Sequence, residues 1–195
     1  MSFLSYVIII AVLIGNVASF ERTTIPPLLD SPTYSLATLN LDGSTNHNIL
    51  TYATPLSVTP NRVWSIGLFK GTRSEENFQR TGMAVLQLLR EPHAKLVQLL
   101  GGTSGRTIDK QTECAQLGFP WVRLDDDAPM VLPGCEAYLI LCQMGGNIDL
   151  GSHVAAICRV DAMYEGDKYE GKSIPLMTAK LRRMGIITKQ GRVSE

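Results

Sequence analysis

The chain has 195 residues, a length that favours a single domain. Its 18 basic and 18 acidic side chains balance, which argues against a protein that binds nucleic acid through an excess of positive charge. Apolar residues make up 45% of the chain, enough for a core, and the 17 glycines and 10 prolines indicate many turns, as in a strand-rich fold.

Residues 1–19 have the pattern of a targeting leader. An apolar stretch from Tyr6 to Ile14 is followed by small residues, and Val17 and Ser19 fit the positions before a signal-peptide cleavage site. The stretch is short for a membrane span and no basic flank follows it. We therefore expect a cleaved signal peptide and entry into the secretory route, with an uncleaved membrane anchor as the alternative.

The junction "VASFER" resembles the bipartite plastid-targeting leaders of algae with secondary plastids, in which a phenylalanine follows the cleavage site. A plastid destination and plain secretion both stay open. Residues 20–33 are interrupted by prolines, and we expect an irregular lead-in there, followed by one domain over residues 34–195.

Strands are expected wherever alternating, β-branched or aromatic residues gather between turn signals. Asp42 and Gly43 form a hairpin-type turn signal after the first strand. Pro55 interrupts the second strand, which favours an edge, a bulge or a break at that point. The expected strands cover residues 34–41, 48–58, 62–69, 83–89, 119–124, 136–144 and 153–164.

Short helices are expected between these strands, at residues 72–80, 92–102, 109–118 and 174–185. Strands do not alternate regularly with long helices, and no G-x-G-x-x-G opens a helix after a strand. A doubly wound sheet and a dinucleotide-binding Rossmann fold are therefore disfavoured. The sequence predicts a mainly β fold, a closed or partly closed β-barrel with short helices.

The cysteines and histidines do not have the spacing of a metal site. The four cysteines form no C-x-x-C pair and there are only three histidines, so we assign no metal ligand. Cys142 and Cys158 lie in apolar, strand-like runs, where a buried free thiol is the common state. We therefore expect no disulfide.

The stretch "LFKGTRSEENF" is the first candidate for chemistry. A strand ends, a glycine permits close approach, and Thr72 and Glu75 have the spacing of a helix capping box. The first N–H groups of a helix lack internal partners and attract anions. We expect Glu75 and Glu76 to face solvent. The hydroxyl and basic side chains that could hold a phosphate are Lys70, Thr72, Arg73 and Ser74. The alternative is an ordinary capped helix.

Two further stretches have the polar pattern of a binding site. "NHNILTYATPLSVTP" carries hydroxyl residues beside Tyr52 in a run broken by Pro55, and its backbone could meet the edge of a planar heterocycle. In "DLGSHVAAICRV", His153 follows a glycine turn and opens a strand, so it could stand at the mouth of a site. The alternatives are an ordinary strand rich in threonine and tyrosine and a structural histidine.

In order and spacing these stretches resemble the flavin reductase-like, FMN-binding split-barrel family. "PLSVTP" matches the family's V-S-x-x-P element, and Gly151-Ser152-His153 matches its G-D-H strand start. The lysine, hydroxyl and x-x-N element matches Lys70, Thr72, Ser74 and Asn77. The resemblance covers Tyr34 to Val160. The chain departs from the family at Ser152, which replaces an acidic residue, and at Thr51-Tyr52, which replaces two serines.

The resemblance implies a split-barrel flavoprotein that transfers a hydride from NAD(P)H to the N5 atom of FMN, with FAD also possible. His153 would be the catalytic residue near the flavin face. The flavin-contacting positions would be Asn48, Thr51, Tyr52, Ala53 and Thr54, and the phosphate-contacting positions Lys70, Gly71, Thr72 and Ser74. A homodimer is implied. The other partners would be flavin and nicotinamide molecules, with no nucleic acid and with membrane contact only through an uncleaved leader.

Two alternatives stay open beside the reductase. The first is a flavin-binding carrier, sensor or electron relay without reductase activity of its own. The second is a secreted β-barrel without a cofactor.

Overall fold

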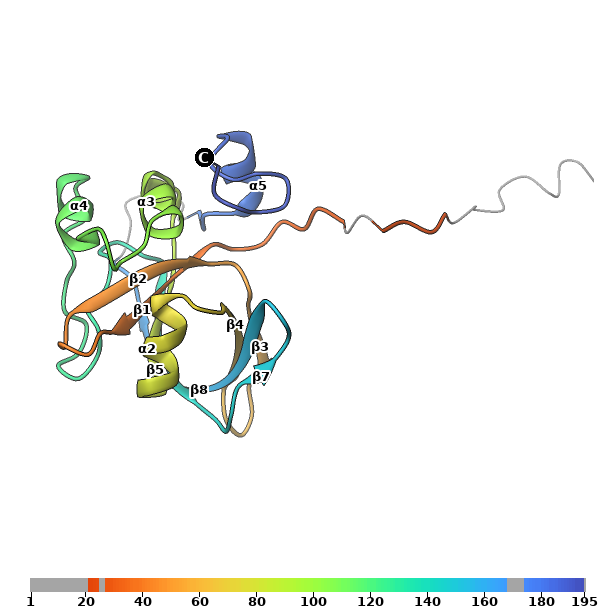
Figure 1. Ribbon diagram of the computed structural model, residues 1–195. Helices are drawn as coiled ribbons and strands as arrows, with labels where there is room; N and C mark the ends of the chain where they lie inside the picture. Colours follow the sequence, from red (N-terminus) through yellow and green to blue (C-terminus); the bar gives the residue numbers. More distant parts are fainter. Residues whose placement is uncertain (1–20, 25–26, 168–173, 195) are drawn as a thin grey trace, which may run out of the picture.

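The computed structural model describes residues 21–24, 27–167 and 174–194 (Figure 1). The leader predicted over residues 1–19 lies outside these residues, so the signal peptide and its destination stay predictions. Within the described residues, eight strands form one sheet in the order β2-β1-β5-β6-β8-β4-β3, with β7 beside β8. All neighbouring strands are antiparallel. The expected mainly β fold is confirmed.

The strands follow the predicted order along the chain. They are β1 (Tyr34–Leu39), β2 (Thr45–Leu50), β3 (Ala53–Ser57), β4 (Val63–Phe69), β5 (Met83–Leu88), β6 (Ala137–Gln143), β7 (Ile148–Asp149) and β8 (His153–Glu165). The β1–β2 hairpin turns at Asp42 and Gly43, as predicted. Asp42 Oδ1 accepts a hydrogen bond from the Ser44 N–H (3.0 Å), and Gly43 has a φ of 81°, which favours glycine.

The sheet has a hydrophobic core on each face, because successive side chains of a strand point to opposite sides. Along β5, Val85 belongs to one core, while Ala84 and Leu86 belong to the other. Helices cover the sheet on both sides: α2 (Arg73–Thr81), η1 (Glu91–Leu96), α3 (Val97–Gly102), α4 (Lys110–Gln116) and α5 (Thr178–Arg183). Phe78 of α2 is fully buried in the Ala84 core, whereas residues of α3, α4 and α5 pack in the Val85 core.

Helix α2 begins and ends near the predicted residues, but its capping box is half formed, because the Glu75 carboxylate accepts the Gly71 N–H instead of the Thr72 N–H. Thr72 is its N-cap and accepts the Glu75 N–H at 3.3 Å. Gly82 ends it in the left-handed conformation, with a φ of 64° and its N–H bonded to Phe78 O. The caps at both ends of α2 are therefore hydrogen bonds between residues close together in the sequence.

Two predicted strands differ in the structure. The run expected over residues 48–58 is two strands, because the chain leaves β2 after Leu50 and re-enters the sheet at Ala53. Pro55 lies inside β3, which is an edge strand whose register shifts after that proline, as its missing N–H permits. The segment 119–124 is not a strand and makes only an isolated bridge between Val122 and Val131. The segment is rich in apolar residues because it packs against the core, in which Trp121 is buried.

The four cysteines are free thiols, and Cys114, Cys135 and Cys158 are buried. Over the described ranges, no helix has both the length and the apolar character needed to span a membrane. In the same residues, no cluster of three histidine, cysteine or acidic side chains could hold a metal ion.

Candidate functional site

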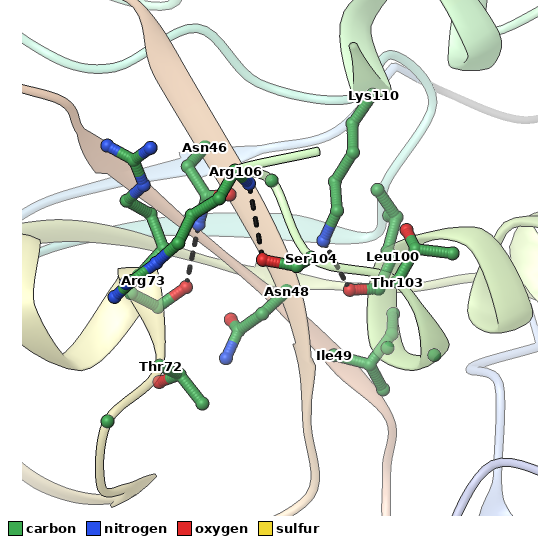
Figure 2. A pocket seen from close by; sticks show the side chains of 15 residues that line it. Asn46, Asn48, Ile49, Thr72, Arg73, Leu100, Thr103, Ser104, Arg106 and Lys110 are labelled. Atoms are coloured by element: carbon green, nitrogen blue, oxygen red, sulfur yellow. Dashed lines mark hydrogen bonds between the residues drawn. The ribbon is translucent and has the colours of Figure 1, made fainter. Parts of the chain in front are cut away.

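A pocket of about 360 Å³ lies between β2, the start of α2 and the loop that joins α3 to α4 (Figure 2). We call residues 101–106, Gly-Gly-Thr-Ser-Gly-Arg, the glycine loop. The lining residues are Asn46, Asn48, Ile49, Gly71, Thr72, Arg73, Ser74, Leu100, residues 101–106 and Lys110. The wall is polar on the α2 side and cationic at several positions, a composition that suits an anionic ligand.

The start of α2 forms one wall of the pocket. Glu75 is buried rather than facing solvent as expected, because its carboxylate accepts the Gly71 N–H at 3.1 Å and a bond from Gln79. Thr72 Oγ1 donates to Phe69 O at 2.8 Å. Among the described residues, the backbone N–H groups of Arg73 and Ser74 have no acceptor. These two groups therefore remain for an anion at the positive end of the helix.

Two buried side-chain atoms in the pocket wall also lack a partner among the described residues. They are Oδ1 of Asn48, an acceptor, and Nε of Arg73, a donor. A buried polar atom without a hydrogen-bond partner lowers the stability of the fold by about 1–3 kcal/mol. Such atoms are therefore uncommon unless water or a ligand forms a hydrogen bond with them. A ligand with an anionic group and hydroxyl groups would satisfy both atoms.

Lys110 contributes a buried charge to the pocket. Only 5% of it is exposed, and its ammonium donates to His47 O at 2.9 Å and to Leu100 O at 2.8 Å (Figure 2). An ammonium has three N–H groups, so one has no acceptor among the described residues. Burial lowers the pKa of Lys110 to about 8. The charge is therefore present at neutral pH and is lost in mildly alkaline solution.

The glycine loop lies tightly against β2. A side chain at Gly105 would collide with Oδ1 of Asn46, and one at Gly101 would meet Ile49 and Val193 at 3.1–3.3 Å. Asn46 Nδ2 in turn donates to Ser74 Oγ at 2.9 Å, which ties β2 to α2 (Figure 2). The glycines thus let the loop approach the strand closely enough to close the pocket on that side.

His153 lies outside the pocket, at the start of β8 as predicted. Its ring is 5.4 Å from that of Tyr52 and 5.1 Å from that of Phe69, edge to face in both cases. Its Nδ1 atom is 2.9 Å from Ser152 Oγ. We call Tyr52, Phe69 and His153 the aromatic group. Tyr52 and Phe69 are largely exposed, so the aromatic group presents apolar ring surface to solvent.

The nine positions predicted to contact a flavin divide into two sets. Four of them line the pocket, namely Asn48, Gly71, Thr72 and Ser74. The other five, Thr51, Tyr52, Ala53, Thr54 and Lys70, do not. The Lys70 ammonium instead bonds Asp149 Oδ1 at 2.5 Å, and the Lys70 side chain lowers the pKa of that carboxyl. The structure adds Asn46, Ser104, Arg106 and Lys110, for which the sequence predicts no site role. The glycine-rich run before α4 is a local signal for Ser104, Arg106 and Lys110, whereas Asn46 is brought to the pocket by β2.

A sequence model of the flavin reductase-like domain matches residues 28–186. The chain belongs to the flavin reductase-like family. The family member described here has no match among curated proteins.

Solved structures of the family share the fold. Flavoredoxin from Methanosarcina acetivorans has a TM-score of 0.67 and 15% identity, over 83% of this chain and 86% of that one. The FMN-binding protein from Thermus thermophilus has a TM-score of 0.66 and 18% identity, over 82% and 90%. The NADH:FAD oxidoreductase from Streptomyces globisporus has a TM-score of 0.63 and 11% identity, over 76% and 81%. The predicted FMN-binding split-barrel fold is thereby confirmed.

Proposed function

We propose that this protein binds FMN with its phosphate in the pocket and transfers a hydride from NAD(P)H to the flavin. One observation carries the proposal: Asn48, Arg73, Ser74 and Lys110 line the same pocket, and among the described residues Asn48 Oδ1 and the N–H groups of Arg73 and Ser74 have no partner. A phosphate monoester would accept from the donors, and a ribityl hydroxyl would donate to the acceptor. Membership of the flavin reductase-like family supports this assignment.

The residues present fit the phosphate end of a flavin. The N–H groups of Arg73 and Ser74, the Nε atom of Arg73 and the Lys110 ammonium would bind the phosphate. Lys70, to which the sequence analysis gave this role, is engaged by Asp149. In the proposed site, Lys110 takes the charge-supplying role that Lys70 was expected to have.

The isoalloxazine ring would lie toward the aromatic group. Tyr52 follows Asn48 by four residues, a reach of at most about 14 Å in extended chain, and Gly71 follows Phe69 by two. The same chain segments that line the pocket therefore lead to the aromatic rings. When bound, FMN would supply hydride chemistry at N5. The protein would bind the phosphate, present apolar rings beside the reacting rings and orient the nicotinamide with His153.

Replacing His153 with alanine is expected to slow flavin reduction by NAD(P)H about 100-fold, because the nicotinamide loses a group that orients it. FMN affinity should change little, because His153 lies outside the pocket. Fluorescence titration measures FMN affinity, and anaerobic bleaching of bound flavin by NADH or NADPH measures reduction. Equal reduction rates in the variant and the wild type would rule out this role. Absence of FMN binding by the wild type would overturn the proposed function.

A second candidate is a flavin-binding carrier or electron relay without reductase activity. It is favoured by the surroundings of His153, whose Nδ1 atom meets the Ser152 hydroxyl rather than a carboxylate. The nearby Asp149 is already engaged by Lys70. A protein that binds FMN tightly but is not bleached by either nicotinamide in the absence of oxygen would support the relay.

A homodimer is the proposed assembly. Large apolar side chains are exposed on the neighbouring strands β3, β4, β7 and β8 and in their turns, namely Tyr52, Leu56, Val58, Phe69, Ile148, Leu150 and Met163. Such exposed apolar clusters are typical of protein interfaces.

Light scattering should give the mass of a dimer for the wild type. A Leu56→Glu variant should shift toward monomer, because it places a charge in the apolar cluster. Leu41→Glu, in the exposed β1–β2 turn, is the control and should stay dimeric. A wild-type monomer that still binds FMN tightly would contradict this assembly.

A further inference from the structure

An ion pair joins the two walls of the pocket. The guanidinium of Arg106, from the glycine loop, bonds the carboxylate of Glu76, from the first turn of α2. Figure 2 shows the Arg106 side chain reaching from the glycine loop toward α2. Both side chains are about half exposed, 47% for Arg106 and 50% for Glu76. Since Arg106 lines the pocket, the pair forms part of its rim. We call it the strap.

The strap links the glycine loop to α2, and each of these segments also contacts β2. The glycine loop is fixed to β2 through the close approach of Gly105 to Asn46, and α2 is fixed to β2 through the Asn46–Ser74 bond. The Arg106–Glu76 contact joins the loop to the helix directly. An exposed ion pair contributes little to stability, so the strap can open at low cost when a ligand needs the space.

Two forms of flavin would meet this strap differently. The phosphate of FMN is a terminal monoester with three free oxygens and nearly two negative charges at neutral pH. In FAD the same phosphorus has two free oxygens and one charge, and it is linked onward to an adenosine monophosphate group. A pocket of about 360 Å³ is at the small end of the range for ligand sites. It has room for a terminal group, whereas a dinucleotide must leave the pocket across its rim.

We propose that the Arg106–Glu76 strap selects flavins that end in a monophosphate, so that FMN binds in preference to FAD. This inference rests on the proposed flavin site. Arg106 closes over a terminal phosphate and adds a positive charge to it, while Glu76 holds Arg106 in place. The adenosine end of FAD must separate the pair to leave the pocket and forfeits that contact.

The positive charge of the pocket wall also favours FMN over FAD. Arg73, Arg106 and Lys110 are three cations around one pocket. Glu76 pairs with Arg106 and Asp42 is within electrostatic range of Arg73, so the surplus rests mainly on Lys110. A dianion gains more from this surplus than the singly charged internal phosphate of a dinucleotide. The Glu75 carboxylate is directed to the Gly71 N–H, so it pairs with none of the three cations.

The test compares FMN and FAD affinities, measured by fluorescence titration at low ionic strength. The double variant Glu76→Gln with Arg106→Gln removes the strap without leaving an unpaired charge. The ratio of FMN to FAD affinity should fall about fivefold in this variant, the upper range for an exposed pair. The matched control is Arg159→Gln with Asp161→Asn, a similarly exposed ion pair on β8, and its ratio should equal that of the wild type.

Glu76→Gln alone provides a second readout, because the glutamine amide oxygen can still accept from Arg106 but no longer offsets its positive charge. FMN affinity should rise about two- to fivefold at low salt, and the gain should shrink as salt is added. A double variant that binds both flavins with the wild-type ratio would overturn the strap, as would a wild type that binds FAD more tightly than FMN. A wild type that binds neither flavin would overturn the proposed function itself.

Discussion

Replacing Lys110 with methionine is expected to weaken FMN binding about tenfold or more, because it removes the buried cation of the phosphate site. The same change strands two carbonyl oxygens, of His47 and Leu100, that the ammonium now bonds. We expect it to lower the free energy of unfolding by about 2–4 kcal/mol. Flavin titration and chemical denaturation measure the two effects separately.

The pH dependence of FMN binding provides an independent check on Lys110. Its pKa is lowered to about 8 by burial, while the phosphate of FMN is already dianionic above about pH 7. FMN affinity should therefore fall as pH rises through about 8, and the Lys110→Met variant should show a flat profile. Lys95→Met, at an exposed lysine that lies over Phe119, is the control and should keep the fall. A wild type whose affinity is constant across this range would contradict the assignment.

The protonation of Lys110 should also affect the free energy of unfolding, which should rise with pH where FMN affinity falls. The pKa of Lys110 is lower in the folded state, so the unfolded chain binds more protons between about pH 8 and its ordinary value of 10.5. The Lys110 contribution to the free energy of unfolding therefore rises with pH across this window. The methionine variant lacks this contribution.

Acid should lower the free energy of unfolding, because the buried histidines must take up protons. This is the second large effect that we expect. His47 is fully buried, and its pKa is lowered from 6.5 to about 3, mainly by burial. The folded state therefore excludes a proton that the unfolded chain accepts. The stability due to neutral His47 is complete above about pH 6.5 and declines below it by up to about 1.4 kcal/mol per pH unit.

The hydrogen bonds of His47 fix which nitrogen of its neutral ring carries the proton. Its Nε2 atom is 3.1 Å from Met130 O, which can only accept, so the ring proton lies on Nε2. The Nδ1 atom then accepts from Gln87 Nε2 at 3.1 Å and from Ser35 Oγ at 3.0 Å. Trp121 packs against the ring, with 4.3 Å between centroids. A second proton on Nδ1 would displace the Gln87 N–H and would leave the buried Ser35 hydroxyl as its acceptor among these partners.

Denaturation measured between about pH 7 and pH 4.5 tests this expectation, since most carboxylates stay ionised there. Burial also lowers the pKa of His93, so the wild type should lose stability with a slope of up to two protons. Changing His47 to glutamine should remove about half of that slope, and changing both histidines should remove most of it. A slope that is the same in the wild type and in His47→Gln would show that His47 does not control acid stability.

The chain's local structure could be predicted where a few neighbouring residues decide it. The β1–β2 turn follows from Asp42 and Gly43, because an aspartate bonds the backbone two residues on and glycine adopts a positive φ. The ends of α2 follow in the same way from Thr72, which caps the first turn, and from Gly82, which ends the last. The segment at 119–124 was misassigned because an apolar run has the same composition whether it pairs in a sheet or packs as a loop.

The sequence by itself determined the mainly β fold, the capped helix and the family resemblance, since these depend on short-range patterns of hydrogen bonding and burial. Only the tertiary structure decided which charges surround the pocket. Lys70 bonds an aspartate 79 residues away, and Lys110 reaches the carbonyl of His47, 63 residues away. Such contacts depend on strand order and loop packing, because two side chains can share a site only when the folded backbone brings them together.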